Sequence, residues 1–160
     1  MSRVIAITNQ KGGVGKTTTC VNLAASLVAV KRRVLVVDLD PQGNTTMGSG
    51  VEKNSLRYSV LDVLTQKVNV NKVLQTKTPA GYDLLPANGD LTAAEVELIQ
   101  VHQKEARLRI ALSQLQQPYD FILIDCPPSL SMLTVNALAC ANSVLVPMQC
   151  EYYALEGISA

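Results

Sequence analysis

The stretch Lys11-Gly12-Gly13-Val14-Gly15-Lys16-Thr17-Thr18 decides the fold of this chain. A short apolar run, residues 4–7, precedes it, and an apolar helical run, residues 17–29, follows it. A strand, a glycine-rich turn and a helix in this order are typical of a loop that wraps around phosphate groups. Glycine lets the backbone approach the phosphates closely, and the first N–H groups of the helix attract an anion. We therefore predict that residues 11–18 bind the phosphates of a nucleotide.

Two lysines and a threonine of this loop have distinct predicted roles. Lys16 supplies positive charge toward the β- and γ-phosphates, and the Thr17 hydroxyl can ligate Mg²⁺. The strict pattern G-x-x-x-x-G-K-[ST] fails, because its first glycine would fall at Gln10, and the loop carries a second lysine, Lys11. Since Lys16 occupies the lysine position of its own cradle, we expect Lys11 to reach a phosphate on a neighbouring subunit and neutralise transition-state charge there. The alternative is a solvated lysine.

Length and composition favour one domain with a substantial core, and we expect residues 1–160 to form it. Hydrophobic residues make up 48% of the chain, which is more than a fully solvated domain needs. The net charge of +1 gives no global electrostatic case for nucleic acid or membrane. Neither a signal peptide nor an apolar run of transmembrane length is present in the sequence, so we expect a cytoplasmic protein. A helix starts near residues 153–156, where the sequence stops, so we expect the domain to be incomplete at its C-terminal end.

Apolar runs of strand length alternate with helical patterns along the chain. The predicted strands are residues 4–8, 34–37, 82–86, 121–124 and 144–147. The predicted helices are residues 17–29, a short helix capped by Ser59, a turn capped by Asn71, a helix capped by Asp90, and residues 104–115 and 130–141. The basic run 31–33 is predicted to be a solvated turn. Because the strands are apolar on both faces, the pattern predicts a doubly wound α/β fold with a mostly parallel sheet.

Three acidic side chains stand where two of these strands end, at the edge where such sheets bind ligands. Asp125 closes the run 121–124, the position of an aspartate that holds Mg²⁺ beside a phosphate loop. Asp38 and Asp40 close the run 34–37. One carboxylate there can orient or deprotonate the attacking water, and another can hold the water shell of Mg²⁺. The alternative is turn chemistry, which the sequence of residues 41–44 also supports.

Other classes of site fit the sequence less well. The dinucleotide pattern G-x-G-x-x-G needs Gly or Ala at position 18 and finds Thr18. The guanine-reading pattern N-K-x-D is not met after Asn71-Lys72. His102 has no Ser or Cys triad context, so we interpret it as a core or solvated histidine. The cysteines lack metal-ligand spacing and are predicted to be buried thiols; they are Cys20, Cys126, Cys140 and Cys150.

The stretch 11–18 resembles the deviant Walker A motif of the ParA/MinD ATPases, a class of P-loop NTPases. The segment 38–44, Asp-Leu-Asp-Pro-Gln-Gly-Asn, is similar to their first switch in its ParA/Soj form, and 125–128, Asp-Cys-Pro-Pro, to their second. The segments 84–88 and 151–157 also resemble ParA/Soj chromosome-partitioning proteins. The resemblance spans essentially the whole chain, although family members continue for several more strands and helices.

This resemblance implies an Mg²⁺-dependent ATPase that cycles between an ATP-bound homodimer and a monomer to segregate chromosomes or plasmids. Lys11 then acts across the dimer, Lys16 binds phosphate within its own subunit, Thr17 ligates Mg²⁺ and Asp40 positions or activates water. It also implies a ParB-type partner, sequence-independent DNA binding through regions largely absent here, nucleoid association of the full-length form and no membrane. The alternatives are a MinD-like membrane-associated division-site ATPase, against which residues 40–44 argue, and an inactive nucleotide-binding fragment.

Overall fold

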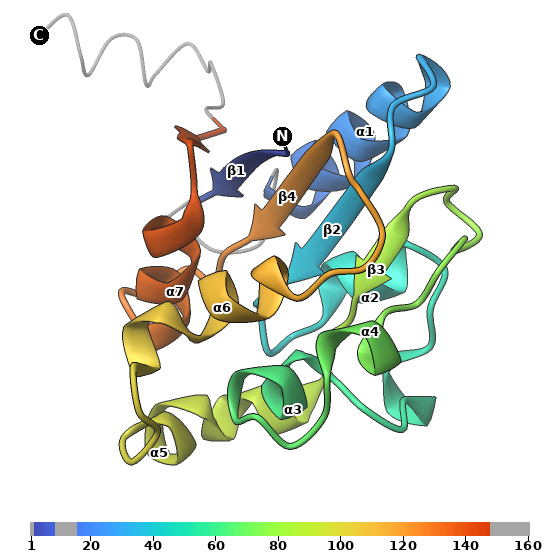
Figure 1. Cartoon of the computed structure of the whole chain (residues 1–160). Coiled ribbons are helices and arrows are strands. Elements are labelled where there is room, and N and C mark those ends of the chain that lie inside the picture. The colour runs from blue at the N-terminus through green and yellow to red at the C-terminus, as the bar shows by residue number, and fades with distance from the viewer. Residues whose placement is uncertain (1, 9–15, 148–160) are drawn as a thin grey trace, which may run out of the picture.

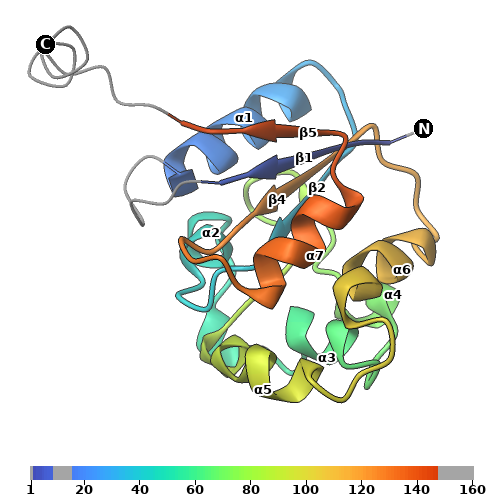
Figure 2. The same cartoon turned by 90° about the vertical axis from the view of Figure 1, so that its left-hand side faces the viewer.

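The computed structural model describes residues 2–8 and 16–147, with the backbone alone for Lys16. Predictions about Lys11, the glycines of the loop, Cys150 and the helix near residues 153–156 lie outside the described residues. The described part forms a sheet with helices on both of its faces (Figures 1 and 2).

The sheet has five parallel strands in the order β3-β2-β4-β1-β5. Their bounds are β1 Arg3–Ile7, β2 Val34–Asp38, β3 Asp83–Leu85, β4 Phe121–Asp125 and β5 Ser143–Leu145. The interior strand β2, which lies between β3 and β4, is buried over its whole length, as its apolar run predicts. The edge strand β5 begins and ends earlier than predicted, and Val144 and Leu145 are exposed. The predicted doubly wound, mostly parallel α/β fold is confirmed, and the described strands are parallel throughout.

Two hydrophobic layers pack on opposite faces of the sheet, because consecutive strand residues point to opposite sides. Helix α1 (Lys16–Ala29) covers one face, where its side chains pack against Val36 of β2 and Leu123 of β4. The other face carries the larger core, which includes Leu35 and Ile122. Its longer helices are α3 Val60–Leu64, α5 Ala94–Leu98, α6 Arg107–Ser113 and α7 Met132–Cys140, and the short α4, Val70–Val73, also contributes. Cys20 and Cys126 are buried as predicted, and Cys140 is partly buried.

The remaining helical elements are short. They are α2 Asn44–Gly48, α4 Val70–Val73, and the 3₁₀ turns η1 Lys53–Ser55, η2 Gly89–Ala93 and η3 Lys104–Ala106. The predicted helix over residues 104–115 is therefore wrong in detail, because it divides into η3 and α6. The predicted start of the last helix at residue 130 is also wrong, because Ser131 is extended and α7 begins at Met132.

The structure corrects two predicted caps and confirms a third. Ser59 caps α3, and its N–H donates to the Asp62 carboxylate at 2.9 Å, completing a capping box. Asn69, rather than Asn71, caps α4, since Asn71 Oδ1 accepts instead from the N–H of Gln116 at 3.0 Å.

The cap predicted at Asp90 is wrong for a similar reason. Asn88 Oδ1 accepts from the Asp90 N–H at 3.0 Å, so the asparagine two residues earlier caps η2. His102 lies exposed in a turn, so of the two predicted alternatives it is the solvated one. The basic run is an exposed turn, as predicted, and Lys31 there has a φ of 65°.

Candidate functional site

The ends of three neighbouring strands meet at one level of the sheet. Ile7 of β1 pairs with Asp125 of β4, and Asp125 pairs with Asp38 of β2. In Figure 1 the arrowheads of β1, β4 and β2 point to this edge. The chain leaves β1 here toward the glycine-rich loop, and α1 begins at Lys16. Parallel topology therefore brings the predicted acids to the edge from which the phosphate loop departs.

Asp38 and Asp125 are both fully buried on adjacent strands. Burial first, and then the neighbouring charge of Asp125, raise the pKa of Asp38 to about 7, against the opposing effect of its hydrogen bonds. Two carboxylates that are withdrawn from water side by side are unfavourable for the fold alone. A cation at this edge would relieve that repulsion, which makes the pair suited to hold one.

Helix α2 holds both carboxylates through consecutive threonines. Thr45 Oγ1 donates to Asp125 Oδ2 at 2.5 Å, and Thr46 Oγ1 donates to Asp38 Oδ2 at 2.7 Å. The Thr46 N–H also donates to Asp38 Oδ2 at 2.9 Å. Thr46 Oγ1 in turn accepts from the N–H of Ala87 at 3.0 Å. Every one of these groups is buried, so α2 is fastened to the ends of two strands.

The sequence patterns did not single out Thr45, Thr46 or Ala87 as site residues. The one sequence feature that could have indicated Thr45 and Thr46 is their position soon after Asp38-Leu39-Asp40. A threonine hydroxyl in the helix after a strand can donate to a carboxylate at the end of that strand. Which carboxylate each would reach depended on the tertiary arrangement of β2 and β4.

Asp40 lies in the tight turn between β2 and α2. Its N–H donates to Asp38 Oδ1 at 3.0 Å, and its own Oδ1 accepts from the N–H of Gln42 at 3.0 Å, forming an Asx turn. Gly43 has a φ of +65°, and a Cβ there would lie 2.8 Å from Lys53 Cδ and 3.1 Å from the Ala87 carbonyl oxygen. The left-handed backbone conformation of this turn therefore favours glycine, and the Ala87 carbonyl leaves little space for a side chain.

Thr17, in the first turn of α1, has a hydroxyl suited to a metal. Its Oγ1 is buried and finds no hydrogen-bond partner in the described part of the chain. A buried hydroxyl is rarely left in this state, and a bound Mg²⁺ would satisfy it. Within residues 2–8 and 16–147, no group of three or more His, Cys, Asp or Glu side chains forms a metal site. Thr17 at the start of α1 and the carboxylates of Asp38 and Asp125 at the strand ends are thus the predicted metal-binding side chains that the structure describes.

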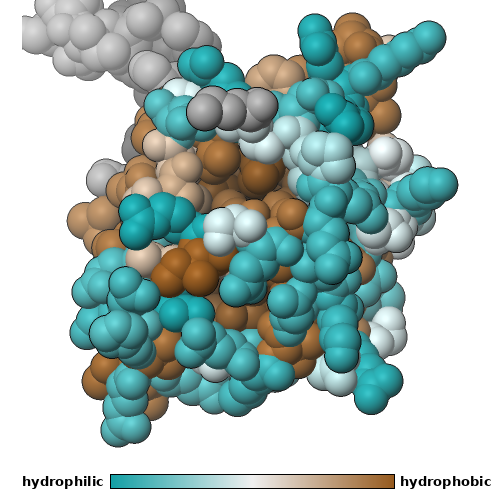
Figure 3. Space-filling view, in the orientation of Figure 1, coloured by the Kyte–Doolittle hydropathy of each residue, from teal (hydrophilic) through white to brown (hydrophobic). Residues whose placement is uncertain are grey.

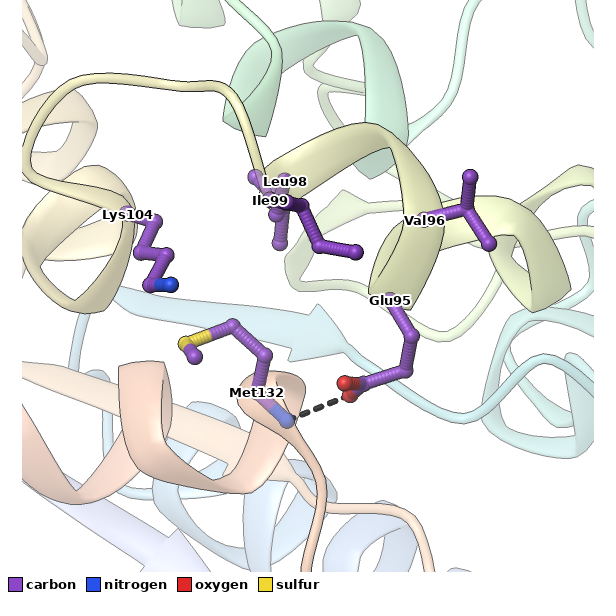
Figure 4. A pocket seen from close by; sticks show the side chains of 6 residues that line it. All are labelled: Glu95, Val96, Leu98, Ile99, Lys104 and Met132. Carbon is purple, nitrogen blue, oxygen red and sulfur yellow. Dashed lines mark hydrogen bonds between the residues drawn. The ribbon is translucent and has the colours of Figure 1, made fainter.

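A pocket of about 260 Å³ lies elsewhere, between α5, η3 and α7 (Figure 4). Val96, Ile99 and Met132 line it, and Glu95 Oε1 accepts from the N–H of Met132 at 2.5 Å. It contains none of the predicted site residues.

In the view of Figure 3, hydrophobic surface gathers toward the left and centre, while the right edge is hydrophilic.

The edge of the sheet, the phosphate-loop pattern and the buried acids together define a P-loop type of nucleotide-binding α/β domain. The sequence model of the family described as AAA domain matches residues 2–160. The chain belongs to this family.

Known relatives agree with that assignment. The chain is 52% identical to the sporulation initiation inhibitor protein Soj of Bacillus subtilis over 99% of its own length and 63% of Soj. It is also 52% identical to the chromosome partitioning protein ParA of Myxococcus xanthus, over 99% of this chain and 56% of that protein. The resemblance to ParA/Soj proteins is confirmed, and the chain spans about 60% of the length of these relatives.

A solved structure with the same fold comes from Mycobacterium smegmatis. It is described as cobyrinic acid a,c-diamide synthase with bound ADP and magnesium, and it shares 46% sequence identity and a TM-score of 0.91 with this chain. The match covers 99% of this chain and 64% of that one. The same protein has also been solved with an ATP analogue and magnesium. As a separate finding, the helices in the described ranges are all too short or too polar to cross a membrane.

Proposed function

We propose that this chain is the nucleotide-binding part of an ATP-hydrolysing partition protein. The observation that carries the proposal is the meeting of Asp38 and Asp125 at the edge where the chain enters the glycine-rich loop. The ParA relative supports partition as the biological role, and ParA and Soj are each more similar in sequence to the chain, at 52% identity, than the M. smegmatis protein is, at 46%.

The proposed ligands are ATP and Mg²⁺. Residues 11–18 would cradle the phosphates, with Lys16 neutralising their charge. Thr17 would bind Mg²⁺ through its orphaned hydroxyl, and Asp38 and Asp125 would hold the metal or its water shell. The bound metal supplies charge stabilisation to the phosphates. The ADP and magnesium bound by the M. smegmatis protein support this choice of ligands.

Asp40 and Lys11 are proposed to complete the hydrolytic site. The Asx turn places the Asp40 carboxylate at the start of the loop that follows β2, where it would orient the attacking water. Lys11 would contribute its charge to the nucleotide of a second subunit, so that hydrolysis would depend on an ATP-bound homodimer. In the full-length protein, the partners would be a ParB-type centromere-binding protein and non-specific DNA, with location in the cytoplasm at the nucleoid.

Substitution of the two lysines tests the proposal directly. Lys16→Ala should weaken ATP binding itself, as measured by fluorescence titration with a labelled nucleotide. Lys11→Ala should leave that binding near the wild-type level but abolish phosphate release. Hydrolysis by Lys11→Ala at the wild-type rate would refute the role of Lys11 across a dimer, and undiminished ATP affinity in Lys16→Ala would refute the phosphate cradle.

Substitution of Asp40 separates turn chemistry from catalysis. Asp40→Asn retains an oxygen that can accept from the Gln42 N–H but loses the negative charge. It should fold normally, bind ATP and accumulate as an ATP-bound dimer on size-exclusion chromatography. Normal turnover by Asp40→Asn would remove Asp40 from the mechanism and leave it as a turn residue only.

A further inference from the structure

Thr45 and Thr46 bind two different strands although they are adjacent in sequence. Successive residues of an α-helix point about 100° apart, so neighbouring side chains diverge. Thr46 reaches back to Asp38 of β2, the strand that leads into α2. Thr45 instead reaches Asp125 of β4, 80 residues further along the chain. The Thr45 hydroxyl therefore joins the loop after β2 to the end of β4.

The contacts of α2 fix where the Thr45 hydroxyl lies. The hydroxyl of Ser49, one turn later, donates to the Thr45 carbonyl oxygen at 2.7 Å and lies 2.5 Å from the hydroxyl of Tyr82. At the other end, the Gly43 N–H donates to the Asp40 carbonyl oxygen at 2.9 Å. Because these contacts fix both ends of α2, the Thr45 hydroxyl has a defined position and can orient the carboxylate that accepts its hydrogen bond.

Asp125 is the acceptor that this donor can orient. Its carboxylate lies beside Asp38 at the same level of adjacent strands, where the two like charges repel each other. The Asp40 N–H holds Oδ1 of Asp38, and the N–H and hydroxyl of Thr46 hold Oδ2. Thr45 holds Oδ2 of Asp125, which restricts the directions in which that carboxylate can face.

We propose that Thr45 is a positioning residue for metal binding: its hydroxyl orients Asp125 toward Mg²⁺ and couples the loop after β2 to the loop after β4. This inference rests on the proposed function, since Asp125 is a metal-binding residue only if the site binds Mg²⁺. Partners of metal ligands commonly alter metal affinity by 10- to 100-fold when removed. Removing the Thr45 hydroxyl should therefore raise the Mg²⁺ concentration needed for tight nucleotide binding by about tenfold.

The test compares Thr45→Val, which keeps the shape and loses the hydroxyl, with Thr45→Ser, which keeps the hydroxyl. Labelled ADP is titrated at a series of Mg²⁺ concentrations, and the midpoint of the Mg²⁺ dependence is read by fluorescence. Thr78→Val is the matched control, because it removes a buried hydroxyl that donates at 2.7 Å to a backbone carbonyl oxygen, that of Tyr82, and not to a carboxylate. Thr45→Val should shift the midpoint about tenfold, whereas Thr45→Ser and Thr78→Val should stay within about twofold of wild type.

The outcomes separate this inference from the proposed function. If ADP binding by the wild-type chain does not change with Mg²⁺ concentration, both the proposed function and the role of Thr45 are overturned. A wild-type Mg²⁺ response with the same midpoint in Thr45→Val would overturn the role of Thr45 alone. An equal shift in Thr45→Ser would assign the effect to packing and also overturn it. If Thr45→Val does not fold, Thr45→Ala is compared with Thr45→Ser, because these two small side chains differ only in the hydroxyl. Equal Mg²⁺ midpoints in these two variants would overturn the proposal.

Discussion

An aspartate at the carboxyl-end edge of the sheet, where the strands end, differs in its pKa from an aspartate at the opposite edge, where they begin. At the edge where the strands end, Asp38 is buried beside Asp125, and burial raises its pKa. At the edge where they begin, Asp120 lies just before β4 and accepts from the backbone N–H of Arg33 at 2.8 Å. This hydrogen bond, together with the Arg33 guanidinium, lowers the pKa of Asp120. Where the strands end, burial and a like charge disfavour the ionised form of Asp38, whereas where they begin, the Arg33 groups favour the ionised form of Asp120. Because strongly perturbed pKa values cluster at functional sites, we propose the binding site where the strands end.

The largest expected difference between the edges is in activity. Asp125→Ala should reduce Mg²⁺-dependent ATP hydrolysis by about 100-fold, because it removes a carboxylate proposed to hold the metal or its water shell. Asp120→Ala is the control at the opposite edge and should retain wild-type turnover. Phosphate release under saturating ATP and Mg²⁺ measures both. Equal activities in the two variants would contradict the functional distinction between the edges.

The pH dependence of stability should have opposite sign at the two edges. The folded-state pKa of Asp38, about 7, lies above the ordinary value of 3.8, so the folded state binds more protons than the unfolded state between these values. Asp38 therefore lowers the free energy of unfolding as pH rises from about 4 to 7, by on the order of a few kcal/mol. Asp38→Asn should flatten this slope in urea unfolding without Mg²⁺.

The lowered pKa of Asp120 acts in the other direction. Its contribution to stability is present above the ordinary aspartate pKa and is lost as pH falls through the lower folded-state value. Asp120→Asn should remove part of the loss of stability seen below about pH 4 and leave the slope between pH 4 and 7 unchanged. A slope that changes in the same window for Asp38→Asn and Asp120→Asn would refute the contrast.

Thr46 should matter more for stability than a threonine outside the carboxylate edge. Thr46→Val removes a donor to Asp38 and leaves the Ala87 N–H without its acceptor, so the free energy of unfolding should fall by about 2 kcal/mol. Thr78→Val loses one bond to a backbone carbonyl and should lower it by about 1 kcal/mol. Urea denaturation of both variants at pH 7 gives the comparison. A larger loss in Thr78→Val would show that the Thr46 contacts contribute little.

The smallest effect is expected from the ion pair of Arg33 and Asp120. The two side chains are 60% and 32% exposed, and the guanidinium nitrogen lies 3.4 Å from the carboxylate. Arg33→Ala keeps the backbone hydrogen bond, so Tm should change by at most about 2 °C, and by less at high salt. Differential scanning calorimetry at low and high salt measures this. A larger change that persists at high salt would mean that packing, not charge, supports this edge.

The strands and the strand-end acids were predictable because both follow from a short-range signal. The apolar runs predicted the positions of β2 and β4, and Asp38 and Asp125 stand at their ends. The caps at Asn69 and Asn88 were missed because each chain segment offers two candidates two residues apart, and only the surroundings decide between them. The site prediction could not include Thr45, since its partner Asp125 is distant in sequence.

The roles of Lys11, Lys16, Thr17, Asp38, Asp40 and Asp125 stay predictions, as does the extent of the domain. The chemical roles of these residues depend on the glycine-rich loop and on bound ligands. The arrangement of the strands depends instead on which residues are buried, and the apolar runs of the sequence indicate these. A sheet edge can therefore be located from sequence with more certainty than the events that occur there.

The bond from the Ala87 N–H to Thr46 Oγ1 provides a spectroscopic reporter of the site. Its acceptor hydroxyl is itself the donor to Asp38, so a change in the charge on that carboxylate is transmitted to the Ala87 amide through a single oxygen atom. The Ala87 cross-peak in a ¹⁵N–¹H correlation spectrum should then move when Asp38 gains a proton or a metal nearby. Occupancy of the strand-end edge could be followed in the unmodified chain, without a label on the nucleotide.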